Sequence, residues 1–233
     1  MIELAVGLGA AALTTLGIGV FHPHAALFGP TVWHGPRERP FVAVTFDDGP
    51  HAEFTPRVLR VLDQYRARAT FFCVGSQIER NLALGRALVA AGHELGNHSY
   101  THNTFRDLFV ASRLSADLAR NQALLSACGP APRFYRPAVG VRNPAVHAAA
   151  RSVGLSVVTW SDSARDGSWP LTPARAQRLA QRARPGDILT LHDGTLPNRK
   201  ALREATVLAL PTLLSQLASR GLSCVTLSTL LDG

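Results

Sequence analysis

Two adjacent carboxylates, Asp47 and Asp48, stand where a run of mostly apolar residues ends. Residues 41–46 predict a buried strand, and Gly49-Pro50 after the acids predicts a turn. Consecutive side chains of a strand point to opposite faces, but a turn at this point can bring both acids to one site. One carboxylate can then bind a cation while its neighbour accepts a proton. Taken alone, the stretch is equally compatible with a surface turn that caps the next helix.

Two histidines, His98 and His102, follow another predicted strand over residues 94–97. Histidines four positions apart share one face of a helical turn, so both imidazoles can reach one ion. With Asp48 they make three protein ligands, which leaves a coordination position open for water, as a catalytic site requires. For the histidines alone, a pair of surface residues is the alternative. Together with the acids, they predict a divalent-cation site.

The rest of the chain must position these groups, and beyond residue 40 it alternates strand-like with helix-like segments. The predicted strands are 41–46, 70–74, 94–97, 133–136, 155–160, 187–191 and 222–226. The predicted helices are 55–67, 77–91, 112–127, 144–152, 173–183 and 203–219. Repeated βα units imply a parallel sheet with right-handed crossovers, and about seven of them predict a distorted or incomplete (β/α)7-8 barrel. Catalytic groups of such folds collect at the carboxyl ends of the strands.

Composition excludes several classes of protein. The 233 residues, 46% of them apolar, suffice for a sizeable core. The net charge of +8 comes almost entirely from arginine, but the arginines are scattered and no nucleic-acid motif is present, so we expect no nucleic-acid binding. The three cysteines are far apart and form no Cys-x-x-Cys pair, which excludes a disulfide framework and a thiolate zinc site.

The N-terminal residues predict a separate segment. Residues 4–21 carry no charge, which is about the shortest apolar run that spans a bilayer. No basic residue precedes the run and no cleavage site closes it, so residues 1–21 predict an uncleaved membrane anchor, with a helix packed on the domain as the alternative. Residues 22–40 are rich in Pro, Gly and His and predict a linker or an irregular strap. Residues 41–233 form the predicted catalytic domain.

Four motifs follow one another along the domain: Thr45-Phe46-Asp47-Asp48-Gly49-Pro50, Gly92-His93-Glu94-Leu95-Gly96-Asn97-His98-Ser99-Tyr100-Thr101-His102, Phe134-Tyr135-Arg136-Pro137 and Leu191-His192-Asp193-Gly194. In this order they resemble the polysaccharide deacetylase family, also called the NodB homology domain or carbohydrate esterase family 4. The stretch Ala69-Thr70-Phe71-Phe72 also looks like the second strand of this family. The resemblance covers about residues 40–230. It implies a distorted (β/α) barrel that uses a divalent metal to remove acetyl groups from N-acetylated sugars or, less often, O-acetyl groups.

The resemblance also implies roles for individual residues. Asp47 would be the general base, and the metal would be held by Asp48, His98 and His102. Arg136 would pair with Asp47 and fix its direction.

Further along the chain, His192 would protonate the leaving amine as a cation. A backbone N–H near Val139, together with the metal, would stabilise the oxyanion, and Trp160 would lie against the substrate.

Three departures from the family pattern concern the substrate pocket. No aromatic residue follows Arg136-Pro137, so an aromatic wall is lost. The element Asp-x-x-Asp-Trp is imperfect: of Asp162 and Asp166, we expect Asp166 to orient His192, with Asp162 as the alternative. Thr190 stands where the family has a leucine, which makes the acyl pocket more polar.

These residues predict a membrane-anchored, metal-dependent hydrolase that deacetylates N-acetylated amino sugars of a cell-wall or other glycan. The ligands favour Zn²⁺, although Co²⁺, Ni²⁺ or Mn²⁺ fits the same set. Alternatives are a deacylase or deformylase of a lipid-linked amino sugar, a sugar O-acetyl esterase and a silent glycan-binding barrel. We expect the domain outside the cytoplasm, where such glycans lie, although Arg37 and Arg39 after the apolar run favour the cytoplasmic side. The oligomeric state is not predicted.

Overall fold

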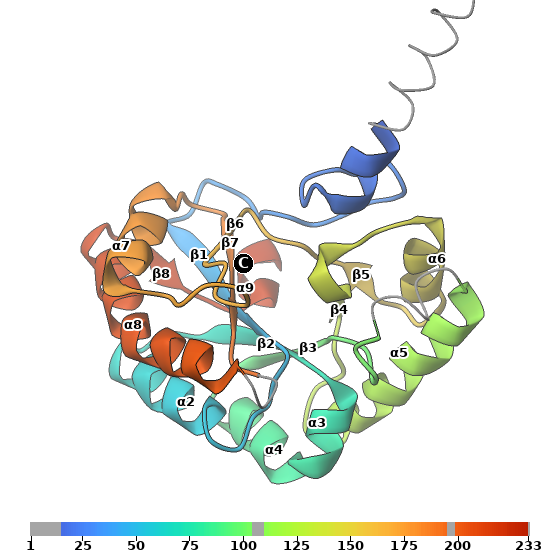
Figure 1. Ribbon diagram of the computed structural model, residues 1–233, viewed down its shortest axis with the longest axis horizontal. Helices are drawn as coiled ribbons and strands as arrows, with labels where there is room; N and C mark the ends of the chain where they lie inside the picture. Colours follow the sequence, from blue (N-terminus) through green and yellow to red (C-terminus); the bar gives the residue numbers. More distant parts are fainter. Residues whose placement is uncertain (1–14, 104–109, 195–198, 233) are drawn as a thin grey trace, which may run out of the picture.

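A computed structural model describes residues 15–103, 110–194 and 199–232 of the chain. Figure 1 shows the strands gathered at the centre of the domain with the helices around them. The strands are β1 (Phe41–Asp47), β2 (Ala69–Cys73), β3 (Glu94–Asn97), β4 (Phe134–Tyr135), β5 (Ser156–Val157), β6 (Asp162–Ser163), β7 (Ile188–His192) and β8 (Ser223–Cys224).

The sheet has the order β5-β4-β3-β2-β1-β7-β6, with β8 paired to β1, and these pairs are parallel. The predicted parallel α/β architecture is therefore confirmed. However, the described sheet begins at β5 and ends at β6, so it is a curled half-barrel and not a closed ring. The strands at both ends contain two residues each, and such short strands offer few backbone groups for pairing. For the same reason β6 shows no strand period in the sequence, and it was not predicted.

The helices are α2 (Thr55–Gln64), α3 (Gly75–Arg80), α4 (Leu82–Ala90), α5 (Ala111–Ser126), α6 (Pro144–Ser152), α7 (Pro173–Arg182), α8 (Lys200–Ser219) and α9 (Leu227–Asp232), with a short 3₁₀ turn η1 (Ala138–Gly140). One predicted helix, 77–91, is two helices. It breaks at Asn81, whose side-chain amide donates to the carbonyl of Gln77 and whose backbone leaves helical geometry. The helix α9 was not predicted.

The central strand β1 is buried along almost its whole length, and its two faces have different surroundings. Val42, Val44 and Phe46 pack on the outer side, in the large apolar cluster that includes residues of α2 and α8. Ala43 points inward, where it joins the cluster of Phe72, Phe134, Ile188, Leu227 and Leu230. Side chains alternate along a strand, so residues 45 and 47 also face the interior. Asp47 therefore lies above a packed interior, at the carboxyl end of the sheet.

The segment before β1 is bound to the domain. Val32 pairs with Val158, and His34 pairs with Asp187. Residues 15–21 are helical, but no helix in the described part of the chain is long and apolar enough to cross a membrane. Residues 1–14 of the predicted anchor lie outside the described residues.

Candidate active site

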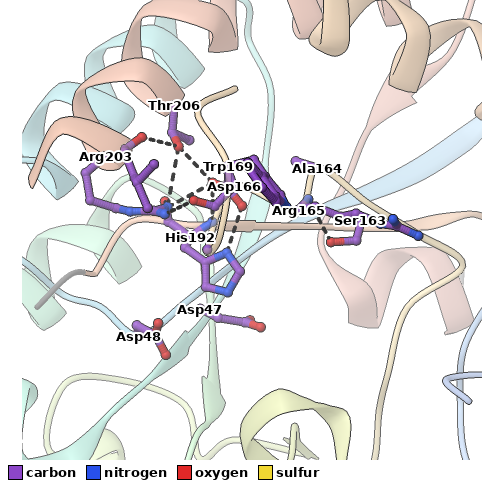
Figure 2. Close-up of polar contacts among 12 residues, drawn as sticks. Asp47, Asp48, Ser163, Ala164, Arg165, Asp166, Trp169, His192, Arg203 and Thr206 are labelled. Atoms are coloured by element: carbon purple, nitrogen blue, oxygen red, sulfur yellow. Dashed lines mark hydrogen bonds and ion pairs between the residues drawn. The ribbon is translucent and has the colours of Figure 1, made fainter. Parts of the chain in front are cut away.

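Asp47 and Asp48 both line one cleft of about 660 Å³ at the carboxyl end of the sheet. Asp47 is the last residue of β1. Asp48 has a φ of 72°, in the left-handed region, so the backbone leaves the extended conformation at this residue and not only at the Gly49-Pro50 turn after it. This change of direction lets two consecutive side chains enter one cleft. Figure 2 shows both carboxylates near the ring of His192.

The three predicted metal ligands meet in this cleft. One ligand atom each from Asp48, His98 and His102 lies within 4.8 Å of the others. The Nε2 atoms of His98 and His102 are 3.4 and 3.2 Å from Asp48 Oδ1. His98 Nδ1 lies 2.6 Å from the Arg136 carbonyl oxygen, which can only accept a hydrogen bond. In the neutral imidazole this contact leaves the Nε2 lone pair directed at the carboxylate, as in histidines that bind metals.

The donor set fits a divalent ion. Two imidazole nitrogens and one carboxylate oxygen converge, and a cation between them would satisfy lone pairs that otherwise face one another. Burial lowers the pKa of His102, which favours the neutral ring that can bind a metal.

The histidine segment is a loop, so the predicted helical turn is wrong. Ser99 and His102 have φ values of 63° and 53°, and these left-handed residues bring the rings of His98 and His102 to a centroid distance of 4.8 Å. Two side chains of α5 hold the loop. Asn121 Nδ2 donates to the Ser99 carbonyl at 2.9 Å, and Asp117 Oδ2 accepts from the Tyr100 N–H at 2.6 Å. Neither contact was predicted from the sequence, although the spacing of four residues places Asp117 and Asn121 on one helix face.

Arg136 lies against Asp47 inside the domain. Its Nη1 is 2.7 Å from Asp47 Oδ1 and also donates to Thr45 Oγ1 at 2.7 Å, while Nη2 donates to the Thr159 carbonyl at 2.8 Å. The guanidinium is fully buried and lies 4.0 Å from the centroid of the Phe72 ring. Burial lowers the pKa of Arg136, and the charge of Asp47 opposes that effect.

His192, the last residue of β7, contacts Asp166 twice. Its Nδ1 lies 2.8 Å from Asp166 Oδ1, and its backbone N–H donates to Oδ2 at 3.0 Å. Burial by itself would lower the pKa of His192, but the charge and hydrogen bond of Asp166 outweigh it and raise the pKa to about 9. Asp162 instead pairs with Arg182 at 2.8 Å on the surface. The structure thus places Asp166, and not Asp162, beside His192.

The residues after His192 hold the turn that carries the acids. The N–H groups of Asp193 and Gly194 both lie 3.2 Å from the Asp47 carbonyl. A Cβ at position 194 would lie 2.1 Å from the carbonyl carbon of Asp48, so glycine permits this approach. The buried Asp193 carboxyl accepts from Thr55 Oγ1, and burial raises its pKa to about 7. These contacts of Asp193 were not predicted.

The walls of the cleft include the remaining predicted residues. Val139 is 68% exposed and has a φ of 49°, and Trp160 lines the cleft on the same side as η1, where its ring contacts Gly140. Trp169 is 66% exposed at the rim. Thr190 is buried two residues before His192, and its hydroxyl has no hydrogen-bond partner among the residues that the structure describes.

Comparison with known proteins supports the family resemblance. A protein-family model described as polysaccharide deacetylase matches residues 34–158. The chain is 35% identical over 205 residues to a peptidoglycan-N-acetylglucosamine deacetylase of Bacillus cereus, covering 87% of this chain and 93% of that protein. It is 39% identical over 191 residues to a chitooligosaccharide deacetylase of Sinorhizobium fredii, covering 78% and 87%.

Solved structures share the fold. The peptidoglycan N-acetylglucosamine deacetylase Bc1960 superposes with a TM-score of 0.77 at 27% identity, covering 87% of this chain and 92% of that chain. BA3943 of Bacillus anthracis, described as a CE4 family pseudoenzyme, superposes with a TM-score of 0.76 at 25% identity, covering 87% and 69%. The fold is therefore shared both with a deacetylase and with a protein described as a pseudoenzyme.

Proposed function

Since the chain belongs to the polysaccharide deacetylase family, we propose that it is a metal-dependent hydrolase that removes acetyl groups from N-acetylated amino sugars of a glycan. One observation carries the proposal: a possible metal-ligand set, a carboxylate paired with a buried arginine and a histidine paired with a buried carboxylate line the same cleft. Two relatives, named a peptidoglycan-N-acetylglucosamine deacetylase and a chitooligosaccharide deacetylase, support the substrate class. A glycan-binding barrel without catalytic activity is disfavoured, because the residues assigned as base, metal ligands and proton donor are all present.

Asp48, His98 and His102 would hold the metal, with Zn²⁺ favoured by the donor set and Co²⁺, Ni²⁺ or Mn²⁺ compatible with it. When bound, a divalent ion polarises the acyl carbonyl and makes a water molecule more acidic. His98 presents Nε2 to the site because the Arg136 carbonyl engages its Nδ1.

The chain's own residues would move the protons. Asp47, held by Arg136, accepts a proton from the water that attacks the acyl carbon. The carbonyl becomes an oxyanion, to which a backbone N–H near Val139 donates. His192 binds Asp166 through Nδ1, so its Nε2–H can reach the cleft. It gives that proton to the amine nitrogen as the carbon–nitrogen bond breaks, which releases the amino sugar and acetate.

An acyl-release assay tests this function. The full-length protein, loaded with one metal at a time, would be incubated with chitooligosaccharides, peptidoglycan fragments and O-acetylated xylan. We expect acetate from the N-acetylated glycans and an equal amount of free amine. Release from the O-acetylated glycan alone would assign an esterase. Absence of release from every substrate, with metal bound, would contradict the proposal and favour a silent glycan-binding barrel.

A second candidate function is that of a deacylase or deformylase of a lipid-linked amino sugar. It is favoured by Thr190, whose hydroxyl has no hydrogen-bond partner among the described residues. An unpaired polar group in the acyl pocket suits a formyl or other polar acyl group better than an acetyl group, whose methyl cannot form a hydrogen bond. Formate and acetate release from N-formyl and N-acetyl versions of one sugar, soluble and lipid-linked, separates the two functions. Thr190→Val keeps the shape of the side chain, so loss of a formyl preference in this variant would assign that preference to the hydroxyl.

We also propose that the domain acts outside the cytoplasm, since one relative is named for peptidoglycan, which is a cell-wall polymer. A phosphatase fused to the C-terminus should then be active in whole cells. If the phosphatase fusion were inactive and a fluorescent protein fused to the C-terminus were fluorescent in the cytoplasm, the lipid-linked substrate would be favoured.

A further inference from the structure

Arg203, on the first turn of α8, contacts both members of the His192–Asp166 pair although no sequence motif includes it. Its Nη1 donates to Asp166 Oδ2 at 2.9 Å and to the His192 carbonyl at 2.6 Å, and its Nη2 donates to the Asp166 carbonyl. The side chain is only 3% exposed. Figure 2 shows the guanidinium on the far side of Asp166 from the imidazole. One arginine thus joins α8, β7 and the loop after β6.

The hydrogen bonds of Asp166 divide between its two oxygens. Oδ1 accepts from His192 Nδ1. Oδ2 accepts from the His192 N–H, from Arg203 and from Thr206 Oγ1, the last at 2.8 Å. Asp166 has no exposed surface, so a rotation of its carboxylate would break these bonds without replacement by water. Oδ1 therefore stays directed at the imidazole.

Charge gives Arg203 a second effect. While His192 is protonated, the buried carboxylate has two cationic partners. Once the imidazole has released its proton, Arg203 alone compensates Asp166. Without Arg203 that release would leave a buried carboxylate without a cation, which is strongly unfavourable.

Other charged groups near His192 do not take over this task. Asp47 and Asp48 raise its proton affinity from the end of β1, and His102 lies beside Asp48. Asp193 is a buried carboxyl that accepts from Thr55; burial raises its pKa and Arg203 opposes that effect, so it supplies no cation for Asp166. Arg136 is engaged by Asp47. Among the described residues, the other arginines that line the cleft are Arg165 and Arg199, and both are exposed.

We propose that Arg203 is a positioning residue of the proton-donating pair, which directs Asp166 at His192 and remains as the counter-charge of Asp166 after His192 has given up its proton. The assignment rests on the proposed function for the use of that proton. It makes the first turn of α8 part of the catalytic apparatus.

Arg203→Gln tests the proposal in the full-length, metal-loaded protein. Without the cation His192 keeps its proton more tightly and becomes a weaker acid. We expect kcat at pH 7 to fall about tenfold or more with KM within about twofold, and the basic limb of kcat/KM to move to higher pH by about half a unit or more. Arg203→Lys keeps the charge, so its basic limb should coincide with that of the parent. Arg57→Gln is the matched control, because it removes the same charge from a residue that does not contact Asp166. Arg57 pairs instead with Glu204, which follows Arg203 in the chain.

A second measurement does not depend on turnover. The imidazole of His192 would be titrated by NMR, with the signal assigned from its loss in His192→Gln, in the chain with and without Zn²⁺. Arg203→Gln should shift this titration upward by the same amount as the basic limb. If the parent shows no hydrolase activity but the titration shifts as expected, the function fails and the contact between Arg203 and the pair stands.

Three outcomes would overturn the proposal. An unmoved basic limb and titration in Arg203→Gln would make the arginine a structural residue only. A shift to lower pH would contradict the counter-charge role, because the lost contact between Asp166 and His192 would then outweigh the lost cation. If Arg203→Gln fails to fold, the pH profile of Arg203→Lys provides the test. The double variant Arg203→Gln/Asp166→Asn should fold, because both buried charges are gone. An unfolded double variant would contradict the electrostatic argument.

Discussion

The guanidinium of Arg136 and the carboxylate of Asp47 form an ion pair of 2.7 Å in which the two side chains are 0% and 5% exposed. Arg136 follows β4 and Asp47 ends β1, so the pair spans the interior of the half-barrel between strands that are not neighbours in the sheet. Arg136 also donates to Thr45 and to the Thr159 carbonyl, which fixes the guanidinium. Asp47 is thereby held in one direction at the base of the cleft.

Arg136→Gln should therefore reduce both stability and activity. It leaves a buried carboxylate without its cation, which we expect to lower the free energy of unfolding by about 3 kcal/mol or more and kcat by about a hundredfold. Arg133→Gln is the control, since its ion pair with Asp232 is more than half exposed and should contribute far less to stability. Denaturant unfolding measures both variants. Equal losses in the two would contradict the importance of the buried pair.

Metal content should separate the ligands from the base. His98→Ala and His102→Ala each remove one of three ligands, so each should weaken metal binding by about a hundredfold or more and abolish turnover. Asp47→Asn should keep the metal and lose activity by about a hundredfold or more, because it removes a proton acceptor. Elemental analysis of the purified variants measures this. If Asp47→Asn emptied the site while Asp48→Asn left it full, the roles of the two acids would be reversed.

The loop that carries the histidines should depend on α5. Asn121 is buried and donates to the carbonyls of Cys73 and Ser99. Asn121→Ala should loosen the loop and weaken metal affinity by about tenfold or more without removing a ligand. Asn81→Ala, which loses a side-chain hydrogen bond to the Gln77 carbonyl and not to the histidine loop, serves as the control. Metal titration with a competing chelator would show the difference, and unchanged affinity in Asn121→Ala would exclude this support.

The pH dependence of catalysis should follow Asp166. This carboxylate raises the pKa of His192 to about 9, so the imidazole stays protonated at neutral pH and the basic limb of kcat/KM should lie near that value. Asp166→Asn should move the limb toward or below the ordinary value of about 6.5, reduce the rate at pH 7 and leave metal content unchanged. Asp162→Asn is the matched control because its carboxylate pairs with Arg182 on the surface. A shift in the control alone would transfer the role to Asp162.

Stability should also respond to the His192 proton. The folded pKa of about 9 lies above the ordinary value of 6.5, so the stabilisation is complete below pH 6.5 and is lost as pH rises through 9. The free energy of unfolding should fall by up to about 3 kcal/mol across this window. His192→Gln should remove that fall. Chemical denaturation of the metal-free protein at pH 6, 7.5 and 9 gives the comparison, and an identical slope in the variant would contradict the shifted pKa.

The sequence by itself determined the fold class and most of the central strands. A continuous run of mostly apolar residues, as in β1, is a local property of the chain, so it can be read without knowledge of the partner strands. The motifs around Asp47, His98, Arg136 and His192 also identified the family, because each motif is a run of consecutive residues that can be read directly from the sequence. Strands of two residues are too short to show a periodic pattern of apolar residues. The loop 98–102 depends on residues in the left-handed conformation that are not glycine, so its sequence gives no sign of that conformation.

Only the tertiary structure decided between alternative partners and identified the contacts of residues outside the motifs. Asp162 and Asp166 are four residues apart, yet one faces Arg182 on the surface and the other faces His192 in the interior. Arg203 is 37 residues from Asp166, and Asn121 is 22 residues from the loop carbonyl that it binds. These distances along the chain are bridged by the register of parallel strands and by helix packing on the curled sheet. Which side chains contact each other therefore depends on how the sheet and helices are assembled, and local residue patterns do not contain this information.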